Sequence, residues 1–239
     1  MTEPLASDTA MVMAAGLGKR MRPLTANMPK PLVPVQGKPL IDHALDRLAE
    51  EGIAKAIVNV HYFPDALEAH LRNRDQPAVT ISDERMRLLE TGGGMVRARH
   101  LLPDPFFCIN SDNIWLNGPK PALQELSSFW DAGRMDALLL VVGCEPATNF
   151  RGEGDFSLDA AGRLRRREPD GAAPFIYTGI QLVSHRLLRD APDGPFSTNV
   201  LWDRAIEEDR LFGVAFNGLW FEVGTPEAIQ TTEAALAGA

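Results

Sequence analysis

Short apolar runs alternate with segments of helical periodicity through the first 142 residues of the chain. The runs that could form buried strands cover residues 11–15, 56–60, 106–110 and 137–142. Between them, residues 39–51 place five aliphatic side chains on one helical face, and residues 64–72, 93–102 and 120–132 are weaker helix candidates. Strands that alternate with helices predict an α/β fold, with a doubly wound, mostly parallel sheet covered on both faces.

The second half of the chain has a different pattern, typical of antiparallel strands. DFSLD and LRRRE predict a hairpin around Gly162, and FIYTGIQLV predicts a longer strand. LFGVAFN and LWFEV meet at Asn217-Gly218, which predicts a second hairpin. Thr225 and Pro226 fit the N-cap and first position of a final helix. We therefore predict an antiparallel, partly helical lid on the α/β core.

Composition and charge exclude several classes of protein. The formal net charge of −8 argues against a general surface for nucleic acid or anionic membrane. Cys108 and Cys144 lie in apolar runs, outside any CxxC or Cys/His cluster, so we expect neither zinc nor a disulfide, as suits the cytoplasm. No apolar run approaches the ~18 residues of a membrane span. The first residues show no signal-peptide pattern, and we expect residues 1–9 to be a flexible extension.

One long connection, from Ala14 to Leu40, combines glycines, prolines and cations directly after the first predicted strand. Gly16 and Gly18 can expose backbone N–H groups to phosphate, although a GxG alone fits a plain turn equally well. GLGKRM lacks the third glycine of the dinucleotide fingerprint, and GLGKR is not a Walker loop, which disfavours an NAD-dependent dehydrogenase.

Two cations in this connection strengthen the case for a phosphate site. Arg20 follows Gly18 by two residues, and Lys30 stands between Pro29 and Pro31. Prolines restrict the backbone and lower the entropy lost when a loop is ordered. A site that holds cations against a polyphosphate needs such stiffness, whereas a solvated linker does not.

The stretch AAGLGKRMRPLTANMPKPLVPVQGKPLI resembles the signature of the nucleoside-diphosphate-sugar pyrophosphorylases, the sugar-1-phosphate nucleotidyltransferases. Their pattern is roughly LAAGxGxRxxPLTxxxPKPLxPVxGKP, and further landmarks follow in order, so the resemblance covers about residues 10–235. It implies a single nucleotidyltransferase domain over residues 10–239, with a Rossmann-like nucleotide-binding part over about 10–142 and a sugar-binding lid over about 143–239.

The resemblance implies roles for the residues that match these landmarks. Arg20 and Lys30 would be catalytic cations. The segment LLETGGGM at 88–95 is similar to the one that lies along base and ribose, with a helix restarting at Met95. The nucleotide-binding residues implied in the two segments are Ala14, Ala15, Gly16, Gly18, Glu90, Gly92 and Gly93.

Two carboxylates match the family's magnesium ligands. Asp112 ends the predicted strand in FFCINSDNIW, and Glu222 lies in GLWFEVGTPEAI, where relatives have aspartate. A carboxylate at a strand end can hold Mg²⁺ against phosphate oxygens. Taken singly, Asp112 would be a turn residue and Glu222 a strand-edge acid. Ser111 replaces the glycine of most relatives and could crowd the sugar side.

The sugar-binding residues implied by the resemblance are Gly154, Thr178 and Gly179. Several relatives carry Glu-Lys-Pro between these positions, and here the lysine is missing. The run Arg165-Arg166-Arg167 is better explained as a solvated hairpin face, and His61 as a structural residue.

The implied reaction joins an NTP and a sugar-1-phosphate into an NDP-sugar and releases pyrophosphate. Within the family, the compact length, LLETGGGM, GEGDF and the missing lysine favour members that use UTP and N-acetylmuramate-1-phosphate in peptidoglycan recycling. Members that join GTP to mannose-1-phosphate are the alternative, and a non-catalytic NDP-sugar-sensing subunit is an alternative of another class. We expect a monomer or simple homodimer.

Overall fold

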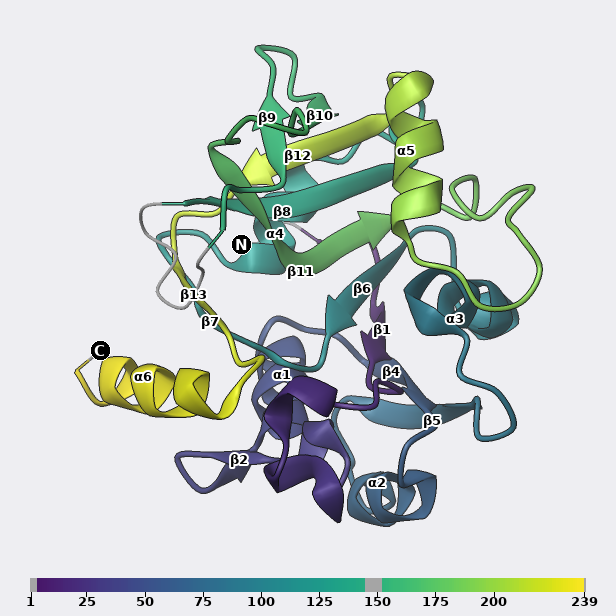
Figure 1. Cartoon of the computed structure of the whole chain (residues 1–239). Coiled ribbons are helices and arrows are strands. Elements are labelled where there is room, and N and C mark those ends of the chain that lie inside the picture. Colours follow the sequence, from purple (N-terminus) through teal and green to yellow (C-terminus); the bar gives the residue numbers. More distant parts are fainter. Residues whose placement is uncertain (1–3, 145–151, 239) are drawn as a thin grey trace.

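The computed structural model describes residues 4–144 and 152–238, and it contains a large mixed sheet, two small sheets and six α-helices in that part of the chain (Figure 1). The strands of the large sheet are β1 (Thr9–Met13), β4 (Lys55–Val60), β5 (Ala78–Asp83), β6 (Phe106–Asn110), β8 (Ala137–Gly143), β9 (Phe156–Leu158), β10 (Leu164–Arg166), β11 (Phe175–Val183) and β12 (Leu211–Ala215). The helices are α1 (Leu40–Glu50), α2 (Pro64–Leu71), α3 (Glu90–Ala98), α4 (Ala122–Phe129), α5 (Asn199–Glu207) and α6 (Pro226–Ala237).

The large sheet is parallel from β5 to β6 and mixed from β6 onward. Strands β5, β4, β1 and β6 are parallel neighbours. Strand β11 runs antiparallel to both β6 and β8, and β12 pairs in parallel with β8. The β9–β10 hairpin lies beside β11. The predicted α/β class is confirmed.

Two apolar layers cover the sheet because successive side chains along each strand point to opposite faces, and helices pack on both. On one face, side chains of β1, β4 and β6 pack against α1, α2 and α4, as with Val12, Val58 and Leu45. On the other face, residues such as Met11 and Cys108 pack against α3 and α5. Among the described helices, none has the length and apolar character needed to cross a bilayer.

A third cluster joins the glycine- and proline-rich connection to the end of the chain. The strands β7 (Asn113–Leu116) and β13 (Leu219–Glu222) form a small antiparallel sheet, and β2 (Pro34–Val35) pairs with β3 (Lys38–Pro39). Met21, Val33 and Phe221 are buried together, with Ile229 of α6 against them. Residues more than 180 positions apart in the sequence thereby form one wall of the molecule.

The predicted hairpin at Asn217-Gly218 is wrong. β12 pairs with β8 and β13 with β7, so the chain crosses between two sheets here instead of turning back. Gly218 is not in the left-handed conformation that the favoured hairpin turns require. A Cβ at Gly218 would lie 2.2 Å from the Leu116 carbonyl oxygen, so this glycine permits a close crossing of two backbones.

The flexible extension expected over residues 1–9 does not hold for residues 5–9. Leu5 and Ala6 pack against the core, and the Ala6 amide donates to Ser127 Oγ at 3.1 Å. Thr9 is already in β1. Residues 1–3, and residues 145–151 of the predicted lid, lie outside the described part.

Candidate functional site

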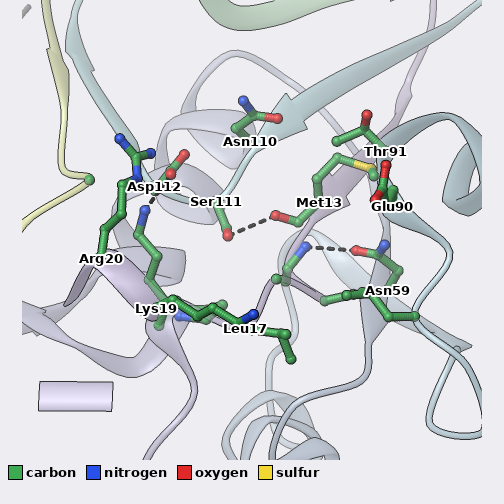
Figure 2. Close-up of a pocket in the computed structure, with 18 of the residues that line it drawn as sticks. Met13, Leu17, Lys19, Arg20, Asn59, Glu90, Thr91, Asn110, Ser111 and Asp112 are labelled. Atoms are coloured by element: carbon green, nitrogen blue, oxygen red, sulfur yellow. Dashed lines mark hydrogen bonds and ion pairs between the residues drawn. The ribbon is translucent and has the colours of Figure 1, made fainter. Parts of the chain in front are cut away.

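A pocket of about 600 Å³ opens at the carboxyl ends of β1 and β6 (Figure 2). This is the edge where ligands of open α/β sheets gather, and the volume suits a nucleotide-sized ligand. Arg20 and Asp112 lie on one side of it, and Asn59, Glu90 and Thr91 on the other. The predicted residues that line it are Ala14, Ala15, Gly16, Gly18, Arg20, Lys30, Glu90 and Asp112.

The connection after β1 is a compact series of one-turn 3₁₀ helices, Lys19–Met21, Leu24–Ala26 and Lys30–Leu32. Gly18 adopts φ 60°, and a Cβ there would lie 3.0 Å from Lys30 Cβ and from Thr25 Cγ2. The Thr25 hydroxyl donates to the Gly18 carbonyl at 2.8 Å. By contrast, a Cβ on Gly16 would meet nothing within 4 Å, so the backbone here faces open space. The connection is thus packed beneath and open above, as a phosphate cradle requires.

Lys30 points into this pocket and pairs with Asp112. Its Nζ lies 2.5 Å from Asp112 Oδ2, and the two side chains are 13% and 22% exposed. Pro29 is extended and Pro31 is buried, so the lysine side chain projects from a rigid turn. Two residues 82 positions apart in the sequence therefore meet on the Arg20 side of the pocket (Figure 2).

Arg20 and Glu222 form a second ion pair, with Nη2 and Oε1 3.1 Å apart. Gly224 provides the room, because a Cβ there would lie 3.0 Å from Glu222 Oε1 and 3.2 Å from Arg20 Nη2. Pairing of β13 with β7 places Glu222 opposite Asn113, next to Asp112, and the Val223 amide donates to the Asp112 carbonyl at 2.9 Å. Asp112, directly before β7, and Glu222, the last residue of β13, therefore lie at the same end of this small sheet.

The donor set at these strand ends fits a magnesium ion. Mg²⁺ is usually held by one or two carboxylates and by substrate phosphates, with water completing an octahedron. Asp112 lines the pocket, and Glu222, which is not among the described residues that line it, lies beside it in an ion pair with Arg20. Within residues 4–144 and 152–238, no group of three or more His, Cys, Asp or Glu side chains could hold a metal alone. The remaining ligands would have to come from a substrate and water.

The glycines of LLETGGGM lie inside α3, which begins at Glu90 and not at Met95 as predicted. Cβ atoms on Gly92 and Gly93 would lie 2.3 Å from the Phe196 ring and 2.5 Å from the Gly194 carbonyl oxygen. The amides of both glycines donate to the Phe196 carbonyl, at 2.9 and 3.3 Å. In this structure, Gly92 and Gly93 seat the segment before α5 and do not line the pocket; Glu90 does.

Glu90 has φ 59°, a left-handed conformation that a residue with a side chain adopts at a cost. Such strain persists only where neighbouring contacts fix it. Glu90 follows Leu89, whose amide donates to the buried Glu84 carboxylate at 3.2 Å. The strained residue is thus held at the edge of the pocket.

The three residues implied for sugar binding are not among the described residues that line this pocket. Thr178 is fully buried, and its hydroxyl donates to the Leu140 carbonyl at 2.8 Å. Gly154 and Gly179 have φ values of 80° and 79°. A Cβ on Gly179 would lie 1.8 Å from the buried Asn113 Nδ2, which has no hydrogen-bond partner among the described groups. A direct sugar contact by the three residues stays a prediction.

Sequence reasoning missed five polar residues of the pocket: Lys19, Asn59, Thr91, Asn110 and Ser197. Asn59 lies within β4 and Ser197 just before α5, so sheet order, not local sequence, brings them to the site. The hydroxyl of Ser111 donates to the Met13 carbonyl at 2.8 Å, which ties the ends of β6 and β1 together. Crowding of the sugar side by Ser111, which lines the pocket, stays a prediction.

The remaining predictions concern residues that do not line the pocket. The basic run is on the exposed hairpin, where Arg165, Arg166 and Arg167 pair with Asp209, Asp203 and Glu153. His61 Nδ1 lies 2.8 Å from the Glu84 carbonyl oxygen, which agrees with a structural role. Burial raises the pKa of the Cys108 thiol to about 12, and both cysteines are free.

Known proteins match this chain over nearly its whole length. Residues 9–156 match the nucleotidyl transferase family. N-acetylmuramate alpha-1-phosphate uridylyltransferase of Caulobacter vibrioides is 46% identical, over 98% of this chain and 99% of that protein. The enzyme of that name from Neisseria meningitidis serogroup B is 33% identical, over 96% and 98%.

A solved structure supports the fold. UDP-glucose pyrophosphorylase complexed with UDP-glucose has a TM-score of 0.79 to this chain, with 16% identity over 97% of this chain and 99% of that one. At that identity the likeness concerns the fold alone. With the family match over residues 9–156 and the 46% identity, the resemblance read from the sequence is confirmed: this chain belongs to the nucleotidyl transferase family.

Proposed function

We propose that this protein joins UTP to N-acetylmuramate-1-phosphate and gives UDP-N-acetylmuramate and pyrophosphate. The observation that carries the proposal is that Lys30, Asp112 and Arg20 line one pocket, with Glu222 paired to Arg20 beside it. The choice of substrates is supported by the two similar uridylyltransferases, of which the first matches 46% of residues.

The reaction needs alignment and charge neutralisation more than proton transfer. The phosphate of the sugar is ionised at neutral pH, so its oxygen can attack the α-phosphorus of UTP without a general base. The bond between the α-phosphorus and its bridging oxygen breaks, and pyrophosphate leaves with the electron pair. Lys30 is assigned to the α-phosphate and the incoming sugar phosphate, and Arg20 to the β- and γ-phosphates.

The backbone at residues 14–18 would cradle the triphosphate, with Gly16 giving open access. Asp112 and Glu222 would hold Mg²⁺, which when bound neutralises charge on the phosphate oxygens. In the free protein each carboxylate is paired with a cation, so binding replaces each ion pair by contacts to substrate. Gly154, Thr178 and Gly179 are assigned to the sugar side as a prediction from the family resemblance. Cytoplasmic location and a monomeric or simple homodimeric state stay predictions as well.

The test is a matrix of UTP, GTP, CTP and ATP against N-acetylmuramate-1-phosphate, mannose-1-phosphate and glucose-1-phosphate, scored by pyrophosphate release with Mg²⁺. The proposal expects the highest kcat/KM with UTP and N-acetylmuramate-1-phosphate. A preference for GTP and mannose-1-phosphate would overturn the substrate assignment. Binding of UDP-sugars with no pyrophosphate release in any pair would instead indicate a sensing protein.

A further inference from the structure

A buried pair, Asn59 and Glu84, connects the two segments assigned above to the nucleotide. Asn59 belongs to β4 and is 1% exposed, and Glu84 follows β5 and is 2% exposed. Asn59 Nδ2 donates to Glu84 Oε1 at 2.8 Å. Because β1, β4 and β5 are adjacent and parallel, the pair lies beneath the edge where the pocket opens.

Each member of the pair also binds a backbone amide of one nucleotide segment. Asn59 Oδ1 accepts from the Ala14 amide at 2.7 Å, at the start of the phosphate cradle. Glu84 Oε2 accepts from the Leu89 amide at 3.2 Å, directly before the strained Glu90. One chain of three hydrogen bonds therefore runs from the cradle to the nucleoside segment. Figure 2 shows the first of them, the bond that Asn59 accepts.

The packing leaves the pair little freedom. A Cβ on Gly94 of α3 would lie 2.8 Å from Glu84 Oε1 and 3.0 Å from Asn59 Nδ2, so the helix rests directly on both groups. Burial raises the pKa of Glu84, while hydrogen bonds from Asn59 and Leu89 oppose that rise. Asn59 Nδ2 and the Leu89 amide, which contact the two carboxylate oxygens of Glu84, are both donors, as an ionised carboxylate requires.

We propose that Asn59 and Glu84 are positioning residues that set the spacing between the triphosphate cradle and the nucleoside segment, and so determine nucleotide affinity. The proposal rests on the nucleotidyl transfer proposed above. Neither side chain is assigned a contact with the reacting phosphates. The pair acts through the backbone amides of Ala14 and Leu89, to which it is hydrogen-bonded. Loss of the pair should weaken nucleotide binding and leave binding of the sugar phosphate unaffected.

The pair can be tested by exchanging its chemistry. Asn59→Asp alone places two carboxylates 2.8 Å apart, and Glu84→Gln alone turns a donor toward either Asn59 Nδ2 or the Leu89 amide. The double variant reverses the central hydrogen bond and keeps an acceptor for both Ala14 and Leu89. Side-chain size is almost unchanged throughout.

We expect each single variant to raise the KM for UTP at least about tenfold, with the KM for the sugar phosphate within about twofold of the wild type. The double variant should return the KM for UTP to within about threefold. Hydrogen exchange at Ala14 and Leu89 should accelerate in Glu84→Gln and slow again in the double variant. Dissociation constants for Mg·UTP, measured by calorimetry, should follow the KM values.

Glu51→Gln is the matched control, because Glu51 also accepts from one side-chain amide, Asn117 at 2.9 Å, and one backbone amide, Leu123 at 2.7 Å, away from the pocket. It should leave the KM for UTP unchanged. A double variant as impaired as the worse single one, or single variants that raise both KM values equally, would overturn the proposal. If the wild type turns over GTP and not UTP, the proposed substrate is wrong, and Mg·GTP replaces Mg·UTP as the probe of the pair.

Discussion

Replacement of Lys30 by alanine should abolish most turnover while the protein stays folded. We propose that Lys30 contacts the phosphates that react, and removal of one such group typically costs about 2.7–4 kcal/mol of transition-state stabilisation, or 10²–10³ in kcat. The partner that it leaves, Asp112, keeps 22% of its side chain exposed, so water can replace the ammonium. We therefore expect the unfolding free energy to fall by about 1–3 kcal/mol, between the losses typical of an exposed and of a buried pair.

The assay is steady-state pyrophosphate release at saturating UTP and sugar phosphate, with urea denaturation as the check of folding. Lys38→Ala is the matched control, because Lys38 lies in the same connection and pairs with Asp46 on α1, at the surface and outside the pocket. It should keep kcat within about twofold of the wild type. A Lys30→Ala enzyme with kcat within about threefold of the wild type would refute the role assigned to the ammonium.

Three further predictions concern the metal, the backbone and pH. Asp112→Asn should raise the magnesium concentration needed for half-maximal turnover by roughly tenfold or more, and an unchanged titration would remove Asp112 from the metal site. Gly179→Ala should lower the unfolding free energy by about 2 kcal/mol or more, since it combines φ 79° with a clash against Asn113, whereas Gly37→Ala, at φ 75° in open space, should cost about 1 kcal/mol; equal losses in urea denaturation would contradict the clash. Burial raises the pKa of Glu51 above its value in the unfolded chain, so the unfolding free energy of the wild type falls as the pH rises and Glu51 ionises. Glu51→Gln removes this titration, so the unfolding free energy of the variant minus that of the wild type should increase from about pH 4 to about pH 8. A difference that stays constant over this range would contradict the prediction.

The core of the fold could be predicted because its strands are buried on both faces. The runs at 106–110 and 137–142 coincide with β6 and nearly with β8, since a continuous apolar run suits a strand covered by two helical layers. The Thr225-Pro226 signal was also sufficient: Thr225 is the N-cap of α6, with its side chain accepting from the Ala228 amide. In both cases the residues of the element itself determine its conformation, so the local sequence was enough to predict it.

The errors arose where distant contacts decide the conformation. Gly218 resembles a turn residue, but its lack of a side chain serves a close crossing over Leu116, which no local pattern reveals. Gly92 and Gly93 of α3 resemble a glycine-rich turn, but they are helical residues whose missing side chains leave room for Phe196 and Gly194. Local propensity is a weak guide where tertiary packing overrides it.

The candidate site was predicted in part. Arg20, Lys30 and Asp112 come from motifs that the resemblance supplied, and the structure brings them to one pocket. Asn59 and Glu84 belong to no motif that sequence reasoning used, because their role depends on the order β5-β4-β1 in the sheet. Buried polar residues near the ends of adjacent parallel strands are the signal that could have identified them.

The central claim is that two cations and two carboxylates converge on one magnesium-bound triphosphate. Its most direct test is a crystal structure of the protein with Mg²⁺ and a non-hydrolysable UTP analogue. We expect a metal bound by both Asp112 and Glu222, with the Lys30 ammonium released from Asp112 and hydrogen-bonded to the α-phosphate. A nucleotide bound in this pocket with the Lys30–Asp112 pair intact, or with the metal away from both carboxylates, would contradict it.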